Sequence, residues 1–222
     1  MKPVGRAILL QSHDSGWLPL PVEVVWLTEA ADWSFVSSWR AAARRSDSPS
    51  LRDSLEYAAL AGKRWRYLAG QDVAPDSPAA LRRSIRQQPF GEFGIALAMR
   101  EKATGILGFA FARRTWANSL MLEFLAVSPH SNPGIKGTGA ALMQALATIG
   151  LTIRCEELWG ECTETSQGFY QTLKGRIHQL SPAEQAPDAI RDRFQFSARE
   201  LHALIDPHRV QIKGCAVPPA RA

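Results

Sequence analysis

Three glycines at close spacing are the first feature of this sequence that could do chemistry. Gly134, Gly137 and Gly139 lead directly into an apolar run from Ala140 to Leu146. The first turn of a helix has backbone N–H groups without a partner inside the helix, and these groups together with the helix dipole attract phosphate. Glycine has no Cβ, so the backbone can approach a ligand closely. The spacing therefore predicts a phosphate-bearing ligand at the start of a helix.

The elements on either side of this loop must position it. Leu120 to Val127 is apolar apart from Glu123, which is typical of a strand buried on both faces, and the turn formers Ser128-Pro129 end it. After the glycines, Leu142 and Leu146 fall on one face of a helix. The segment therefore predicts a strand, a glycine-rich loop and a helix in direct succession.

Two common phosphate-binding loops do not fit this segment. In a Walker A loop the lysine follows the last glycine, whereas here Lys136 precedes Gly137. A dinucleotide-binding loop has the order G-x-G-x-x-G directly after the strand. Here position 142 is Leu instead of a third glycine, and a long loop separates Val127 from Gly137.

A third pattern fits. The segment VSPHSNPGIKGTGAALM resembles motif A of the GNAT acetyltransferase superfamily, in which a strand ending in V-x-P is followed by [QR]-x-x-G-x-[GA] and a small-small-Leu-Leu helix start. Residues 137–143 match this motif in register. Position 134 departs from it, because Gly134 stands where the family usually has Gln or Arg, although no backbone donor is lost. The alternative is an ordinary glycine-rich turn into a core helix.

Two further segments resemble the same family. The run TGILGFA at 104–110 is similar to the third strand of the family, commonly written Gly-x-x-Gly-Phe. The pattern Phe169-Tyr170-x-x-Leu173-x-Gly175 resembles the second signature, in which a tyrosine precedes a glycine that starts the next turn. Two positions differ, because the usual Asn and Ala of that signature are Thr163 and Ser166 here.

The resemblance implies an α+β fold, a mixed and mostly antiparallel twisted sheet of about six to seven strands flanked by helices. A splayed pair of parallel strands would hold acetyl-CoA, and a β-bulge in the first strand of the pair would free backbone groups for the pantetheine arm. The diphosphate would meet the N–H groups of the glycine loop. Carried over by position, the implied cofactor-binding residues are Leu125, Ala126, Val127, Ile135, Lys136, Gly137, Thr138, Gly139, Ala140 and Tyr170.

The resemblance also implies direct attack of an acceptor amine on the thioester, with an acid for the thiolate and a base for the amine. Tyr170 matches the family tyrosine near the sulfur and is the candidate acid; the alternative is a tyrosine that only packs. Glu123 is the candidate base, directly or through water, because a carboxylate within an apolar strand needs a partner or a function. We expect Glu123, Leu125 and Val127 to share the strand face at the cleft. An ion pair with a nearby arginine is the alternative for Glu123.

The resemblance implies one GNAT-like acetyltransferase domain, which we expect over residues 1–205, with an enlarged helical region at about 30–88 and a loosely ordered tail at 206–222. The expected elements are strands at 6–11 and 22–28 joined by a loop at 13–21, helices at 30–45, 49–63 and 76–88, an antiparallel meander at 92–100, 105–113 and 120–127, a strand at 157–163 parallel to 120–127, a helix at 166–173 capped by Gly175, a strand at 193–196 and a helix at 198–205.

Composition restricts the class of protein. The chain has 222 residues, 45% hydrophobic and 21% charged, which is ordinary for a globular domain with one sizeable core. No apolar run is long enough to cross a bilayer, and the run Ala7–Leu10 is too short for a signal peptide core. We therefore expect a cytoplasmic protein that does not bind a membrane. The three cysteines lack a C-x-x-C and the histidines are scattered, so neither a disulfide framework nor a metal site is indicated.

The net charge of +5 is concentrated in one region. Residues 40–86 hold ten Lys and Arg against five Asp and Glu, with Trp65 and Tyr67 among them. Such a region could bind an acidic partner or nucleic acid, but the solvated faces of helices are the preferred interpretation. Two functions follow: an N-acetyltransferase that uses acetyl-CoA and a small-molecule or peptide amine, as a monomer or homodimer, or a non-catalytic acetyl-CoA sensor or RNA- or protein-binding module.

Overall fold

The structure, a computed structural model, describes residues 1–43, 49–128, 134–179 and 192–217. The elements within these ranges are β1 (Lys2–His13), β2 (Gly16–Trp26), the 3-10 helix η1 (Ala30–Ser34), α1 (Phe35–Ala43), α2 (Pro49–Ala69), α3 (Pro78–Gln87), β3 (Phe93–Glu101), β4 (Gly105–Arg114), β5 (Leu120–Val127), β6 (Ile135–Lys136), α4 (Thr138–Thr152), β7 (Glu157–Cys162), α5 (Glu164–Thr172), β8 (Arg176–Gln179), β9 (Asp192–Ser197), α6 (Ala198–Leu204) and β10 (Val210–Ile212).

One twisted sheet organises the molecule. Its ten strands run in the order β10-β1-β2-β3-β4-β5-β7-β9-β8, and β6 pairs with β1 off this path. The described pairings are antiparallel except for β5 with β7, as the sequence predicts. The predicted number of six to seven matches the longer strands. β6, β8 and β10 are additions of only two to four residues that carry too little pattern to be recognised in a sequence.

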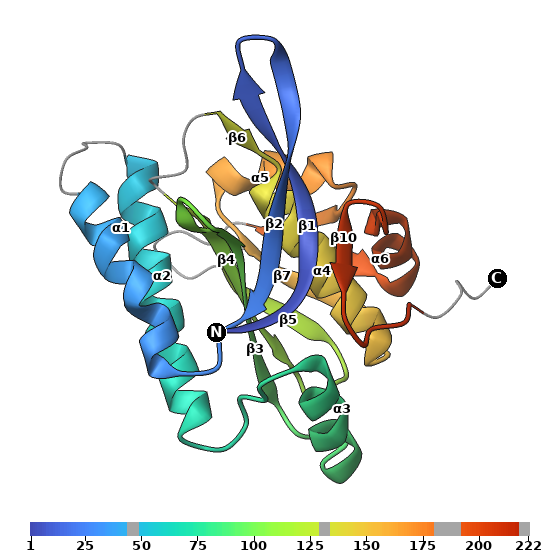
Figure 1. Ribbon diagram of the computed structural model, residues 1–222. Helices are drawn as coiled ribbons and strands as arrows, with labels where there is room; N and C mark the ends of the chain where they lie inside the picture. The colour runs from blue at the N-terminus through green and yellow to red at the C-terminus, as the bar shows by residue number, and fades with distance from the viewer. Residues whose placement is uncertain (44–48, 129–133, 180–191, 218–222) are drawn as a thin grey trace.

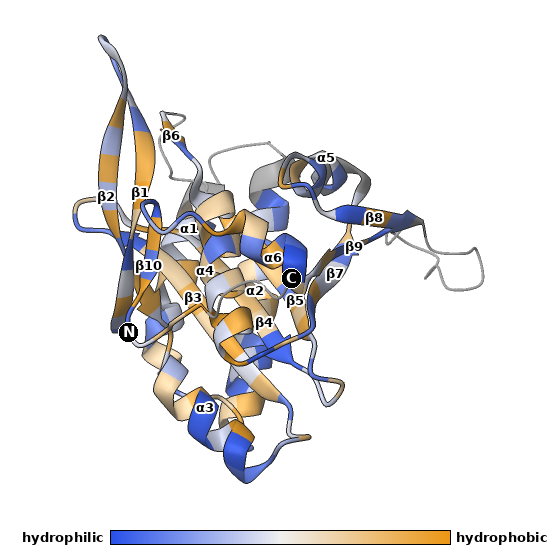
Figure 2. Ribbon diagram, turned by 90° about the vertical axis from the view of Figure 1, so that its right-hand side faces the viewer, coloured by the Kyte–Doolittle hydropathy of each residue, from blue (hydrophilic) through white to orange (hydrophobic). Residues whose placement is uncertain are grey.

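Two hydrophobic cores lie on opposite faces of the sheet. On one face, α1 and α2 cover a core rich in aromatic residues, including Trp33, Trp39 and Phe109. On the other face, α4 packs against the sheet, with α6 and β10 on its outer side (Figure 1). α4 is therefore buried almost all round, and Figure 2 shows it mainly in apolar colours, whereas β8 is mostly hydrophilic. None of the described helices is long and apolar enough to span a bilayer.

The first two strands form a long hairpin whose tip projects beyond the sheet (Figure 1). The loop predicted over residues 13–21 was wrong, because β2 already begins at Gly16 and pairs with β1 along its whole length. Pro19 and Pro21 misled the prediction. Within the described ranges β2 pairs with β3 only from Glu23 to Trp26, so both prolines lie on an edge without a strand partner there, where a missing N–H group costs no ladder hydrogen bond.

The helical region at 30–88 contains η1, α1, α2 and α3, and the predicted end of its first helix at residue 45 lies outside the described residues. α2 extends to Ala69 instead of ending at residue 63. Trp65 therefore lies within the helix, where it is buried against Trp33, while Tyr67 is exposed. The two aromatic residues thus do not form one exposed surface with the neighbouring bases.

The C-terminal segment is more ordered than the sequence predicts. Residues 206–222 were expected to be loosely ordered, but Val210–Ile212 forms β10 and adds to the outer edge of β1. Val210 and Ile212 are buried against the α4 core. The sequence interpretation gave weight to the prolines of this segment and missed a strand with only two inward-facing residues. Residues 218–222 lie outside the described residues.

Candidate active site

The parallel strand pair opens into a cleft. β5 pairs with β7 only where Leu120–Leu122 lies beside Leu158–Gly160. Beyond these residues the two strands separate, and a cleft of about 680 Å³ lies between their ends. Residues of α2 and α5 contribute to its walls. The predicted splayed parallel pair is therefore present, and it leaves the β7-facing edge of Glu123–Val127 without a strand partner among the described residues.

A β-bulge in β5 lies where the strands separate. On β4, Phe111 is opposite Phe124 and Ala112 is opposite Leu122, so Glu123 is the additional residue. The bulge changes which residues face which core, because Leu122 packs in the α4 core and Phe124 packs against the α2 core. A bulge bends its strand and re-aims its side chains, and here it marks the start of the cleft.

The bulge corrects one prediction about the site. Glu123 and Leu125 were expected to share a face of the strand, but Leu125 packs against the α4 core while Glu123 reaches Arg64 of α2. Simple alternation along a strand fails across an inserted residue. Both residues still line the cleft, so the prediction was wrong about the shared face and not about the location.

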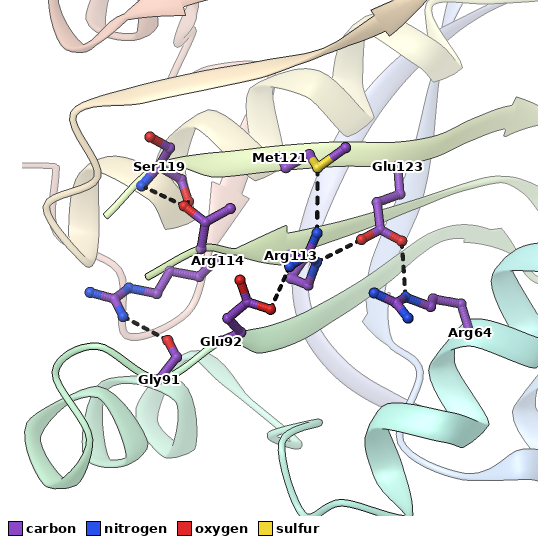
Figure 3. A network of polar contacts seen from close by, with 9 residues as sticks. Arg64, Gly91, Glu92, Arg113, Arg114, Ser119, Met121 and Glu123 are labelled. Atoms are coloured by element: carbon purple, nitrogen blue, oxygen red, sulfur yellow. Dashed lines mark hydrogen bonds and ion pairs between the residues drawn. The ribbon is translucent and has the colours of Figure 1, made fainter. Parts of the chain in front are cut away.

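Glu123 is held between two arginines (Figure 3). Nε of Arg113 donates a hydrogen bond to its Oε1 at 2.7 Å, and Nε of Arg64 lies 3.4 Å from its Oε2. Arg113 also donates to Glu92, just before β3. Burial lowers the pKa of Arg113, but its hydrogen bonds with Glu123 and Glu92 outweigh this effect and keep that pKa above its ordinary value. The network joins α2 to β4 and β5, and it matches the ion pair given as the alternative for Glu123.

Tyr170 lies on α5 at the wall of the cleft. Its side chain is buried, with its ring stacked on Phe194 at a centroid distance of 3.8 Å and an interplanar angle of 9°. Burial raises the pKa of the Tyr170 hydroxyl, with smaller contributions in the same direction from Cys162 and Tyr57. The hydroxyl therefore keeps its proton at neutral pH, as a general acid must.

The two unusual positions of the second signature have a structural role. Thr163 and Ser166 begin α5, where the Thr163 N–H donates to Oγ of Ser166 at 3.0 Å and the two hydroxyls are 3.1 Å apart. They thus cap the helix that carries Tyr170. At the other end, the left-handed residue is Lys174 at φ +63° instead of the expected Gly175. Gly175 is required for space, since a Cβ there would lie 2.6 Å from the ring of Phe196.

The glycine loop begins α4 as predicted. Gly137 is the N-cap residue at φ +94°, in the left-handed region that favours glycine. A Cβ on Gly139 would lie 3.2 Å from the ring of Phe169, so a larger side chain there would crowd α5. Gly139 and Ala140 are partly exposed, which leaves the start of the helix open to a ligand. Pro129, the last residue of the V-x-P pattern, lies outside the described residues.

The first hairpin supports this loop. β6, which is Ile135–Lys136, pairs with Leu10 and Gln11 of β1, and the Ser12 N–H donates to the Gly134 carbonyl at 2.7 Å. Nζ of Lys136 lies 4.2 Å from the ring centroid of Trp17 at the hairpin tip. No local pattern signals this support, because the partners are far apart in the sequence.

The predicted site residues fall into two neighbouring groups. Glu123, Leu125, Ala126, Val127, Gly139 and Tyr170 line the cleft. Ile135, Lys136, Gly137, Thr138 and Ala140 form the loop and first turn of α4 beside it. Sequence reasoning missed the contribution of α2, from which Asp53, Ser54 and Tyr57 also line the cleft. The i, i+4 spacing of Asp53 and Tyr57 on one helix face was the available signal.

No family model and no curated protein sequence matches this chain. Among solved structures, it is similar to a protein of Desulfovibrio desulfuricans assigned to the GNAT acetyltransferases, with 13% identity, a TM-score of 0.54 and coverage of 80% of this chain and 99% of that one. Nourseothricin acetyltransferase is 18% identical over 47% of this chain and 65% of its own, at a TM-score of 0.40. This chain thus spans less than two thirds of that enzyme. At such identities the likeness shows the fold alone.

Proposed function

This chain has the GNAT fold, and from that premise we propose that it transfers an acetyl group from acetyl-CoA to a primary amine. One observation carries the proposal. The cleft between the separated ends of β5 and β7 is bordered by the glycine-rich start of α4 and by a tyrosine that keeps its proton. The helix start that the proposal assigns to the phosphates and the tyrosine that it assigns as the acid therefore lie beside the same cleft.

The residues present fit the donor. In the proposal, the N–H groups of residues 135–140 bind the diphosphate, and the backbone of Leu125–Val127 contacts the pantetheine arm. Two features support this assignment. Gly137 and Gly139, on either side of Thr138, carry no Cβ atom at the start of α4, and β5 has no strand partner on its β7 side there among the described residues. When bound, the donor supplies a thioester carbonyl that is reactive toward an amine.

The chain contributes positioning and proton transfer. Tyr170 holds the proton that the departing thiolate requires, and its stacked ring fixes the position of the hydroxyl. Glu123 accepts a proton from the acceptor amine, directly or through water. The hydrogen bond from Arg113 orients its carboxylate, while the contact with Arg64 is longer. The acceptor is a small molecule or a peptide amine that enters beside α2.

One observation favours a second candidate, a non-catalytic acetyl-CoA sensor. Each carboxylate oxygen of Glu123 has an arginine partner, so the residue could serve only to fix α2 against the sheet. In that case the cleft would bind the donor without an available base.

Two measurements in sequence test the proposal. Titration calorimetry with acetyl-CoA measures donor binding, and release of free thiol is then followed with a panel of polyamines, aminoglycosides, amino acids and peptides. We expect binding and thiol release with at least one class of amine. Tight binding without thiol release on any amine would favour the sensor, and no association at millimolar acetyl-CoA would refute both.

A further inference from the structure

The side chain of Arg209 lies against the start of α4. Its Nη2 donates a hydrogen bond to the Gly137 carbonyl at 3.4 Å. A Cβ on Gly137 would lie only 2.0 Å from the same nitrogen, so the guanidinium occupies the space that a side chain at the N-cap would fill. The absence of a side chain at Gly137 thus admits a cation from a remote part of the chain.

The position of Arg209 follows from the outer edge of β1. Along this edge, β10 pairs with Gly5–Ala7, the Ile8 N–H donates to the Arg209 carbonyl at 2.9 Å, and β6 pairs with Leu10–Gln11. The Arg209 N–H in turn donates to the Asp206 carbonyl at 3.0 Å. One strand therefore holds both the glycine loop and the backbone of Arg209, side by side.

The charge of Arg209 has no anionic partner within the described part of the chain. A cation at the N-terminal end of a helix meets the positive end of the helix dipole, which is unfavourable without an anion. Among the described residues, no carboxylate forms an ion pair with Arg209. Thr138, the first residue of α4, is 3% exposed, and its hydroxyl has no hydrogen-bond partner in the described structure. The helix start is thus rich in donors and poor in acceptors.

The glycine loop itself offers little cationic charge. Gly134 has no side chain, and the ammonium of Lys136 lies over the ring of Trp17. A guanidinium suits phosphate because its N–H groups form paired hydrogen bonds with two oxygens. Arg209 is partly exposed, as a residue that contacts a ligand must be.

We propose that Arg209 binds the diphosphate of the donor, so that the segment 206–212 completes the donor site. This inference rests on the proposed function, because it assumes that the donor's diphosphate meets the start of α4. It adds a residue from outside the sequence motif, and it gives β10 a role beyond closing the edge of the sheet.

The test uses the full chain and three probes: coenzyme A, 3′-dephospho-coenzyme A and pantetheine. Arg209→Gln keeps an amide donor for the Gly137 carbonyl but removes the charge. We expect it to bind coenzyme A and its dephospho form roughly 10- to 100-fold more weakly, as for loss of a hydrogen bond with a charged group. Pantetheine, which has no phosphate, should bind as it does to the unaltered chain. The salt dependence of coenzyme A binding should also decrease.

Lys213→Ala is the matched control. It removes one positive charge from the residue that directly follows the segment 206–212, and Lys213 is exposed, so it should change the affinity for coenzyme A by less than about twofold. If Arg209→Gln lowers the melting temperature of the chain, Arg209→Lys is measured as a second variant, because it keeps the positive charge. Recovery of affinity with the restored charge then supports the proposal, and lack of recovery overturns it.

Several results would overturn the assignment. A folded Arg209→Gln chain with unchanged affinity for coenzyme A would remove Arg209 from the site while leaving the proposed function intact. Equal weakening of coenzyme A and pantetheine would mean that Arg209 only supports the loop. If the affinity fell for coenzyme A but not for its dephospho form, Arg209 would contact the 3′-phosphate. That result would refute the contact with the diphosphate. If the unaltered chain bound no coenzyme A, the proposed function itself would fail.

Discussion

Replacing Tyr170 with phenylalanine tests whether Tyr170 acts as an acid or only packs. The ring of Tyr170 is stacked on Phe194 at 3.8 Å and packs edge-on against Phe169. Phenylalanine keeps both ring contacts and loses only the hydroxyl. We therefore expect the free energy of unfolding to change by less than about 1.5 kcal/mol, the usual net contribution of one hydrogen bond.

The catalytic effect should be much larger. A positioned general acid contributes roughly 10²- to 10⁴-fold to a rate, or about 2.7–5.4 kcal/mol of barrier. Tyr170 is 5% exposed, so little water can replace it as a proton donor. We expect Tyr170→Phe to lower turnover at least about 100-fold and to leave the dissociation constant of acetyl-CoA nearly unchanged.

The pH dependence gives a second readout. Burial raises the pKa of the Tyr170 hydroxyl above its ordinary value near 10, so the acid keeps its proton across the neutral and mildly alkaline range. Turnover should therefore show no alkaline decrease due to this group below about pH 10. The same shift stabilises the fold below the unfolded pKa, and this contribution is lost as the pH rises through the folded pKa.

Tyr57→Phe is the matched control. Tyr57 lines the same cleft from α2, packs against Phe124 and loses the same atom in the variant. Its turnover should stay within a few-fold of the unaltered chain. The reasoning about Tyr170 is refuted if both variants lose turnover equally, or if Tyr170→Phe weakens donor binding as much as it lowers turnover.

Three further variants probe the rest of the site. Gly139→Trp must displace Phe169, which a Cβ would already approach to 3.2 Å, so calorimetry should show acetyl-CoA binding weakened roughly 10- to 100-fold; unchanged affinity would contradict the role of the glycine loop. Gly137→Ala places a Cβ at φ +94° and 2.0 Å from Arg209, so chemical denaturation should show a loss of about 1–3 kcal/mol. Glu123→Gln should lower turnover roughly 100-fold while the affinity for the donor is retained. A lower melting temperature with normal turnover would instead mean that Glu123 serves only in the ion pair with the arginines.

The strand–loop–helix unit could be predicted from the sequence because its signals are local. β5, the glycine turn and α4 follow one another without interruption, and their apolar content, φ requirement and periodicity all agree. The parallel pairing of β7 with β5 could also be predicted, because a crossover through a helix implies a parallel strand. The described sheet confirms the predicted, mostly antiparallel arrangement, and the similarity to a solved structure confirms the GNAT fold.

The features that were missed depend on partners outside the segment itself. The first half of β2 contains turn-forming residues, and only its pairing with β1 makes it a strand. β10 consists of three residues whose stability comes from the edge of β1 and the α4 core. The bulge at Glu123 appears only when β5 is aligned with β4, so no pattern within β5 could reveal that the face changes there. The roles of Glu123 and Tyr170 stay predictions.

The outer edge of β1 has a consequence for the order of assembly during synthesis. Residues near the beginning of the sequence form a template on which the glycine loop and the 206–212 segment are both fixed. A nascent polypeptide therefore cannot complete this arrangement until residue 212 has left the ribosome, even though the hairpin and the glycine turn are made much earlier. Contacts of such long sequence separation form late and slowly. The proposed binding of coenzyme A should consequently be among the last properties that the growing chain acquires.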